Sequence, residues 1–239
     1  MTKDCLNTSA VRAAVLVAAL VALTISGAGL AQAQQVFGRG PAPTISVADS
    51  PSRRVDENGF LQRWLILEPI SVPGQLGDSA IRAAVETEYF EGQFDAVPDH
   101  GDSVTVGDQV LTWHAVDSSL YNVNLFHFSY ALEPPTSNVL FWAVTVVDVP
   151  ETVTDVRLAI GSNAASIWWV NGEEVIGIYN DRQTVIDDGV SQRLQLNPGR
   201  NVIRAAIINA GGATDFCARL LGSDYEPITD LEIRLGMPD

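Results

Sequence analysis

The sequence predicts an all-β protein, a β-sandwich with one short helix in its N-terminal half. From residue 109 onward, short runs of alternating apolar and polar residues follow one another, separated by Gly, Pro, Asn or Asp. This rhythm is typical of sandwiches built from short strands. A parallel α/β sheet would need a crossover helix between successive strands, and the second half of the chain has no room for such helices.

Residues 1–33 are predicted to be a signal peptide that is removed. A positively charged start is followed by an apolar run at 13–30 and by an A-x-A cleavage signal at 31–33. The alternative is a transmembrane anchor, because roughly 18 apolar residues approach spanning length. The cleavage signal and the polar chain after it favour removal. The mature chain is then expected to begin at Gln34, to be periplasmic or extracellular, and to make no contact with the membrane.

Residues 34–58 are rich in Gly, Pro, Ser and Arg and are predicted to be a flexible leader. A single β-sandwich domain is expected over residues 59–239, a length that supports a substantial core. Its first strand is expected at 60–69. The segment 78–90 is predicted to be a helix, because its apolar residues recur at helical spacing and Asp78 or Ser79 can cap its start.

The remaining strands follow from alternation and from the turn residues between them. They are expected at 110–113, 124–133, 137–147, 153–160, 165–170, 174–179, 192–196, 201–208, 215–221 and 231–235.

Two turns have specific chemistry. Asn171-Gly172 lies between two apolar runs, and a two-residue hairpin of type I′ needs positive φ at both central residues, which Asn and Gly tolerate best. At 197–201 the sequence is Asn-Pro-Gly-Arg-Asn, in which Pro presets φ for a turn and Gly supplies the positive φ after it.

Three segments together resemble one known family. Trp169 to Gly172 is similar to a "W-x-N-G" hairpin, Leu196 to Asn201 to an "L-x-x-G-x-N" turn, and Trp64 to Pro69 to a "W-L-v-l-G-P-F" opening strand. In this order they resemble the galactose-binding-like jelly-roll β-sandwiches of secreted bacterial proteins, over residues 60–235. Such domains occur as sugar-binding modules and as accessory domains of polysaccharide-degrading enzymes, so the resemblance implies a binding scaffold.

The chain also departs from that family. Residues 161–164 read Gly-Ser-Asn-Ala where the family often has an acidic "G-S-D-D" turn, so the two carboxylates that could contact an ion or a sugar there are missing. Glu68 stands where the family usually has Gly. Many domains of this class hold a structural calcium ion, and Asp95, Asp99, Asp102 and Asp108 form a loose acidic region with the oxygen ligands that calcium prefers. Solvated loop acids are the alternative, and no other cofactor is expected.

Charge and cysteine content exclude several classes of function. The formal net charge is −15, and the one Lys of the chain lies in the predicted signal peptide. Such a chain repels phosphate backbones and anionic membranes, so nucleic acid is not an expected partner. The one cysteine after residue 33 is Cys217, which lies in a predicted strand and is interpreted as a buried core residue.

Catalytic motifs are weak. Two Gly-Asp-Ser triplets, at 77–79 and 101–103, match lipase-like esterases, but those enzymes need a histidine late in the chain and the last one here is His127. The histidines lack zinc-ligand spacing. Glu173-Glu174 and Asp187-Asp188 are adjacent acids, which point to opposite faces of a strand. A hydrolase of unrecognised type therefore remains a third hypothesis.

Sugar binding needs an exposed aromatic face and planar polar groups. Alternation places Trp168 and Trp169 on opposite faces. Because the resemblance makes Trp169 the core tryptophan, Trp168 is expected to face outward and stack on a sugar ring. Tyr179, Asn180 and Arg182 follow the hairpin and are expected to donate and accept hydrogen bonds.

The leading hypothesis is therefore a secreted, non-catalytic carbohydrate-binding module or accessory subunit that captures a polysaccharide or oligosaccharide. The alternative is a structural or adhesion β-sandwich that binds a protein partner at the cell surface.

Overall fold

The structure is a computed structural model that describes residues 36–37, 44–72, 78–180 and 182–235. The chain divides into two compact units, 1–35 and 36–239, and the described residues all belong to the second. The predicted signal peptide and its cleavage site lie outside the described residues. In the described part, no helix is long and apolar enough to cross a membrane.

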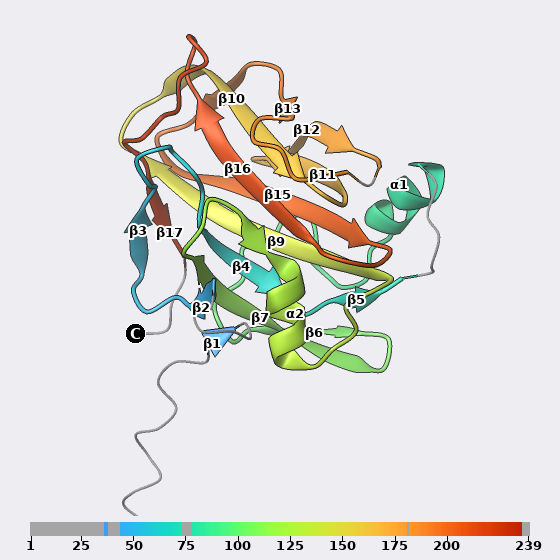
Figure 1. The fold of residues 1–239 in the computed structure, drawn as a ribbon. Helices are drawn as coiled ribbons and strands as arrows, with labels where there is room; N and C mark the ends of the chain where they lie inside the picture. Colours follow the sequence, from blue (N-terminus) through green and yellow to red (C-terminus); the bar gives the residue numbers. More distant parts are fainter. Residues whose placement is uncertain (1–35, 38–43, 73–77, 181, 236–239) are drawn as a thin grey trace, which may run out of the picture. The chain divides into compact units, whose positions relative to one another are not determined.

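The domain is an all-β sandwich of two antiparallel sheets with two short helices (Figure 1). Along its main path the first sheet has the order β1 (Val36–Phe37), β2 (Ile45–Val47), β7 (Gln109–Ser118), β4 (Arg63–Leu67), β9 (Val139–Val149), β15 (Gly199–Asn209), β11 (Ala165–Val170) and β12 (Glu173–Ile178). Four short strands join its flanks, namely β3 (Ser52–Arg54), β5 (Ile70–Ser71), β6 (Ser103–Val106) and β17 (Glu232–Arg234).

The second sheet is smaller. Its order is β13 (Gly189–Val190), β10 (Val153–Ser162), β16 (Asp215–Leu221) and β8 (Val123–Asn124), and β14 (Leu194–Leu196) also pairs with β10. The two helices are α1 (Asp78–Glu86) and α2 (Leu125–Leu132).

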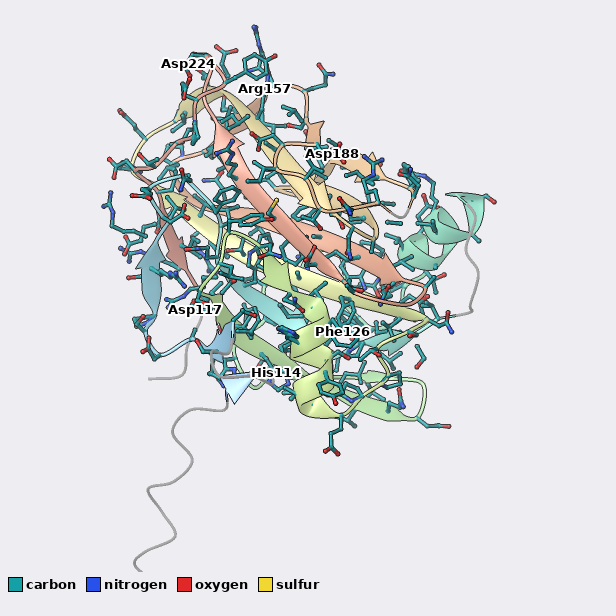
Figure 2. The ribbon with its side chains drawn as sticks, viewed as in Figure 1. His114, Asp117, Phe126, Arg157, Asp188 and Asp224 are labelled. Atoms are coloured by element: carbon teal, nitrogen blue, oxygen red, sulfur yellow. The ribbon has the colours of Figure 1, made fainter. Side chains whose placement is uncertain are left out.

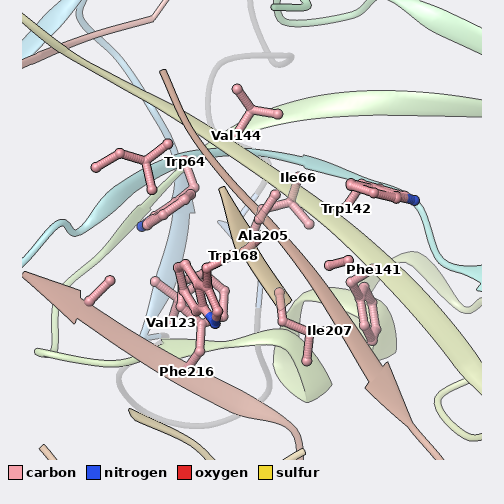
Figure 3. Close-up of a cluster of buried hydrophobic side chains, with 14 of the residues drawn as sticks. Trp64, Ile66, Val123, Phe141, Trp142, Val144, Trp168, Ala205, Ile207 and Phe216 are labelled. Carbon is pink, nitrogen blue, oxygen red and sulfur yellow. The ribbon is translucent and has the colours of Figure 1, made fainter. Parts of the chain in front are cut away.

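The space between the sheets is closed by aromatic side chains (Figure 3). Trp64 and Trp168 from the first sheet and Phe216 from the second are all fully buried. Their rings meet edge to face, with centroids 6.0 Å apart for Trp64–Trp168, 5.1 Å for Trp64–Phe216 and 5.4 Å for Trp168–Phe216. Edge-to-face pairs add to the large apolar area that each ring buries.

The opposite face of the first sheet, here called the outer face, is also covered. Cross-strand register places Arg204 opposite Trp169 and Val144, so these side chains point away from the inter-sheet core. Residues 87–102 lie over this face, with the Phe94 ring centroid 5.6 Å from that of Trp142 and 6.5 Å from that of Trp169. Because both of its faces are buried, the central strand β9 is apolar almost throughout.

Both predicted turns are confirmed, and the structure ties them together. Asn171 and Gly172 have φ of 51° and 86°, and Gly199 has φ of 83°. The fully buried Asn201 accepts hydrogen bonds from the Asn197 backbone N–H at 2.8 Å and from the Asn171 side chain at 3.0 Å. One buried amide thus fixes the geometry of two loops that are distant in sequence.

Most strand predictions are confirmed. For the strands predicted at 165–170 and 215–221, both end residues agree with the structure. The prediction of a strand at 124–133 is wrong, because residues 125–132 form α2. The Asn124 side chain accepts a hydrogen bond from the His127 backbone N–H at 2.7 Å and so caps the helix. At the other end Glu133 adopts φ of 65°, and two prolines follow. The structure therefore has a second helix that the sequence analysis does not predict.

The prediction of a flexible leader also differs from the structure over residues 44–58. Strand β2 pairs with β7, and β3 pairs with β17, so this segment belongs to the first sheet. Its Ile45 is fully buried. The Ser, Pro and Arg content of the segment reflects short strands between turns, which sequence composition does not distinguish from a linker.

Candidate functional site

A groove of about 480 Å³ runs between β12 and β13, where the edges of the two sheets meet. Its lining residues are 176–180 and Arg182 on one side and Asp188 and Gly189 on the other. Figure 2 shows Asp188 beside this end of the sandwich. Three of the four predicted sugar-binding residues, Tyr179, Asn180 and Arg182, therefore line one groove, and the structure adds Asp188.

The polar groups of this groove form a connected network. The Arg182 guanidinium donates to the Asn180 side-chain oxygen and forms an ion pair with Asp188. All three groups are planar and keep donors or acceptors that can reach solvent, since Asn180, Arg182 and Asp188 are exposed. The apolar part of the lining comes from Ile176 and Ile178. An apolar wall beside a few fixed planar polar groups is the usual composition of a small-molecule site.

Tyr179 is held in place from the side of α1. Its hydroxyl accepts a hydrogen bond from Arg82, whose guanidinium carbon lies 5.4 Å from the ring centroid. Arg82 also forms two hydrogen bonds of 3.1 Å to Glu174, and these raise its pKa. The ring of Tyr179 lies against Gly177, where a Cβ would be 2.8 Å from the tyrosine oxygen. Glycine at 177 is thus required for the observed position of the ring.

The prediction that Trp168 faces outward is wrong. Its side chain is fully buried between the sheets, and its indole N–H donates to the Ser166 hydroxyl at 2.9 Å. Trp169 is the tryptophan on the other face, half-buried and stacked on Trp142 with centroids 5.7 Å apart. Alternation correctly separates the two residues. The resemblance assigns them to the wrong faces: Trp168 packs between the sheets on Trp64 and Phe216, and Trp169 lies on the outer face against Phe94.

A second concave region, which the sequence analysis does not identify, lies between the outer face of the first sheet and residues 87–102, here called the covering segment. A cavity of about 470 Å³ is lined by residues 90–92, 96–98 and 101–104, with Trp113 and Arg204 on the sheet side. A neighbouring cavity of about 300 Å³ is lined by Phe94, Asp95, Asn171, Gly172, Val202 and again Arg204. Arg204 is therefore common to both cavities.

Arg204 is 4% exposed, and its Nη2 donates to the carbonyl of Ala96 at 2.7 Å. Burial lowers its pKa, and the negative charge of Asp95 partly offsets this effect. The sequence does carry a signal for this residue. Arg204 is the single charged residue in the apolar run 202–208 of a predicted strand, and a buried charge without a matched partner is a recognised indicator of function.

The four aspartates of the predicted acidic region do not converge. Asp102 accepts a hydrogen bond from the Asp99 backbone N–H at 2.8 Å, which is a local loop contact, and Asp95 lines the smaller cavity. Among the residues that the structure describes, no group of three or more His, Cys, Asp or Glu side chains is arranged to hold a metal ion. These aspartates do not fit a calcium site as they stand, and calcium remains a prediction for a chelator experiment.

The adjacent acids separate as expected for strand and loop residues. Asp187 forms an ion pair with Arg219, whereas its neighbour Asp188 pairs with Arg182. Glu174 pairs with Arg82, and Glu173 is exposed. Each of the three paired acids thus has its own arginine.

The fold brings together two histidines that the sequence separates. His114 lies 3.0 Å from a Glu68 oxygen, and its ring centroid is 6.3 Å from that of His100. His100 accepts a hydrogen bond from the Ala115 backbone N–H at 3.1 Å, and burial, followed by the proximity of His114, lowers its pKa. The third histidine, His127, contacts the Thr44 hydroxyl at 3.2 Å.

Cys217 is confirmed as a buried core residue. Burial raises the pKa of its thiol to about 12. The thiol lies close to Gly161, where a Cβ would be 2.9 Å from the sulfur. It is therefore a packed, protonated side chain at neutral pH.

Neither a protein-family model nor a curated protein sequence matches this chain. Solved structures with a related arrangement include the PA14 domain of the antifreeze protein MpAFP, at 12% identity and a TM-score of 0.43, covering 73% of this chain and 91% of that one. The PA14 sugar-binding domain from an RTX adhesin has 11% identity and a TM-score of 0.43, covering 73% of this chain and 99% of that one.

A third structure is the A domain of epithelial adhesin 9 from Candida glabrata in complex with Galb1-3GlcNAc, at 10% identity and a TM-score of 0.35, covering 84% of this chain and 94% of that one. All three TM-scores are below 0.5. These likenesses therefore carry no conclusion about the function of this chain.

Proposed function

We propose that this protein is an exported, non-catalytic carbohydrate-binding β-sandwich of the galactose-binding-like type. It captures a polysaccharide or oligosaccharide as a free module or as an accessory subunit. The binding site in this proposal is the groove between β12 and β13, with Tyr179, Asn180, Arg182 and Asp188 as its polar and aromatic contacts.

The observation that supports the proposal is the arrangement of planar polar groups beside an apolar wall. Adjacent sugar hydroxyls present paired donors and acceptors, which a guanidinium, a carboxamide and a carboxylate can match in one plane. The apolar faces of a pyranose ring can pack against Ile176 and the partly exposed ring of Tyr179.

The first experiment measures retention of the purified protein in gels that contain plant or algal polysaccharides. Retention by one glycan class is expected, and isothermal titration with an oligosaccharide of that class then gives the affinity. Asn180→Ala and Arg182→Ala should each weaken binding by roughly 10-fold or more, because each removes hydrogen bonds to the ligand, one of them charge-assisted.

Arg54→Ala is the matched control, because Arg54 is an exposed arginine of β3 that forms an ion pair with Asp230 away from the groove. Its affinity should equal that of the unmodified protein. Equal losses in Arg54→Ala and Arg182→Ala would mean that net charge, and not the groove, determines retention. A parallel measurement with a calcium chelator tests the predicted structural ion through a change in thermal unfolding temperature.

The adhesion hypothesis makes a different prediction for the same protein. Val185 and Ile186 are exposed apolar neighbours in the loop that leads to Asp188. Binding of a protein partner would depend on these two side chains and would survive Asn180→Ala. Absence of retention by every glycan tested would contradict the carbohydrate proposal for those ligands and favour this hypothesis.

A further inference from the structure

The first sheet buries two arginines on its outer face, and their surroundings differ. Arg63 is 1% exposed and forms two hydrogen bonds of 2.8 Å to the two oxygens of Asp117. It also donates to the carbonyl and the hydroxyl of Ser50, at 2.7 and 3.1 Å. A buried guanidinium with a bidentate carboxylate and further acceptors is the expected stable arrangement.

Arg204 lacks such a partner. Among the described residues, its one hydrogen bond runs from Nη2 to the Ala96 carbonyl, and no carboxylate lies within ion-pairing distance. Asp95 is near enough to stabilise the charge through space without contact. A guanidinium keeps its proton at neutral pH, so a nearly full positive charge is buried here with free donors. The remaining nitrogens face space, because Arg204 lines two cavities.

A second donor on the same face also lacks an acceptor. The indole nitrogen of Trp142 is buried and has no hydrogen-bond partner in the described part of the protein. Trp142 and Arg204 point to the same side of the sheet, because Trp142 lies opposite Ala206, two residues along β15 from Arg204. The outer face therefore has a positive charge on Arg204 and N–H groups of Arg204 and Trp142 that lack acceptors among the residues described, all covered by residues 87–102.

We infer that Arg204 is the anchor of a binding site for a small carboxylate whose ring or chain occupies the cavity lined by Phe90, Val97, Pro98 and Trp113. The carboxylate accepts hydrogen bonds from the free side of the guanidinium and takes the place that Asp117 has at Arg63. The volume of about 470 Å³ suits a single six-membered ring with its substituents.

The charges around the cavity define the class of ligand further. Glu91 and Asp102 line the larger cavity, and Asp95 lines the smaller one. These acids disfavour a doubly charged phosphate, whereas a carboxylate with one negative charge is matched by the single arginine. The apolar side chains in the lining, Phe90, Val97, Pro98 and Trp113, disfavour a fully hydrated ion. The site is separate from the groove between β12 and β13 and does not depend on the proposed function of that groove.

The test uses the purified protein and two pairs of small ligands, followed by isothermal titration and by tryptophan fluorescence. One pair is galacturonate and galactose, and the other is benzoate and benzyl alcohol. The charged member of at least one pair should bind at least 10-fold more tightly than its neutral partner. The pair in which the charged member binds more tightly shows whether the ring of the preferred ligand is a sugar or an apolar ring.

Two variants locate the site. Arg204→Gln should reduce the affinity for the carboxylate at least 10-fold, and Asp95→Asn should raise it severalfold, because it removes a repelling charge. Arg54→Gln is the matched control, because Arg54 is an exposed arginine of β3 that lines neither the groove nor the cavities, and it should leave the affinity unchanged. The groove and the Arg204 site are thus tested by different variants, so failure of one proposal is distinguishable from failure of the other.

Equal affinity for charged and neutral partners, or no binding of either carboxylate, would overturn the inference. So would carboxylate binding that is unchanged in Arg204→Gln. If Arg204→Gln does not fold, the two ligand pairs and Asp95→Asn decide the question on folded protein. A fall in affinity in Asp95→Asn would make Asp95 part of the site for another kind of ligand and would also contradict the inference.

Discussion

Arg63 and Arg204 are two buried cations on the same face of one sheet, but their hydrogen-bond and ion-pair partners differ. Each donates a hydrogen bond to the backbone of an irregular covering segment, at Ser50 and at Ala96. Arg63 in addition has the carboxylate of Asp117, whereas Arg204 lines two cavities. The charge of Arg63 is therefore fully paired within the protein. The charge of Arg204 has no contacting counter-ion in the described part of the chain. This difference distinguishes a structural arginine from a candidate binding residue.

The largest expected effect is that of Arg63→Met. Removing one member of a buried ion pair leaves the other charge uncompensated, which typically costs 3–5 kcal/mol. We expect about 3 kcal/mol, at the low end of that range, because Arg53 remains 3.5 Å from Asp117. Urea denaturation followed by circular dichroism measures the loss. Adding Asp117→Val should restore part of it, and a loss below about 1 kcal/mol would show that the pair is not what stabilises this region.

A third buried ionisable group extends the comparison to an acid. The pKa of Cys217 is raised to about 12 in the folded protein, against an ordinary thiol value near 9. Above pH 9 the unfolded chain loses this proton and the folded protein keeps it, so stability should fall as pH rises above 9, by up to about 1.4 kcal/mol per pH unit and by about 2 kcal/mol at pH 10.5. Below pH 9 the thiol is protonated in both states and contributes no pH dependence.

The measurement is the difference in unfolding free energy between the unmodified protein and Cys217→Ala at pH 8, 9.5 and 10.5. This difference removes the contributions of other titrating groups. Thiol labelling at pH 8 should also be slow without denaturant and fast with it. A difference that stays constant with pH would mean that the thiol is exposed to solvent in the native protein.

The smallest expected effect is that of Arg204→Met. The variant loses the hydrogen bond to Ala96, worth about 1 kcal/mol, and gains a similar amount because a poorly paired charge is no longer buried. We therefore expect a change in stability within about 1 kcal/mol, measured by the same urea titration. A loss as large as that of Arg63→Met would make Arg204 a structural residue that holds the covering segment, and would remove the contrast between the two sites.

The strands and turns could be predicted because their signals are local. Alternation over 165–170 and 215–221 and the positive φ required at Asn171 and Gly172 depend on a few adjacent residues. The helix α2 could not be predicted, since Leu125–Leu132 is apolar on most sides and carries no clear period. Its cap at Asn124 is a weak signal that a strand start shares.

The candidate site also contains some residues that local sequence signals could identify and others that they could not. Tyr179, Asn180 and Arg182 are close in sequence and could be placed together after the hairpin, whereas Asp188 and the partner Arg82 come from other segments. Alternation could separate Trp168 from Trp169. It could not show which of them is fully buried, because both faces of the first sheet are covered.

The sequence by itself determined the fold class, most of the longer strands, the two turns and the net negative charge. These properties follow from short-range patterning and from composition. Only the tertiary structure decided that Trp168 is core, that residues 44–58 contribute strands to the first sheet, and that Arg204 is buried and lines two cavities. The physical reason is that burial and the pairing of charges depend on which distant segment covers a side chain, and Ala96, which contacts Arg204, is 108 residues away from it in the sequence.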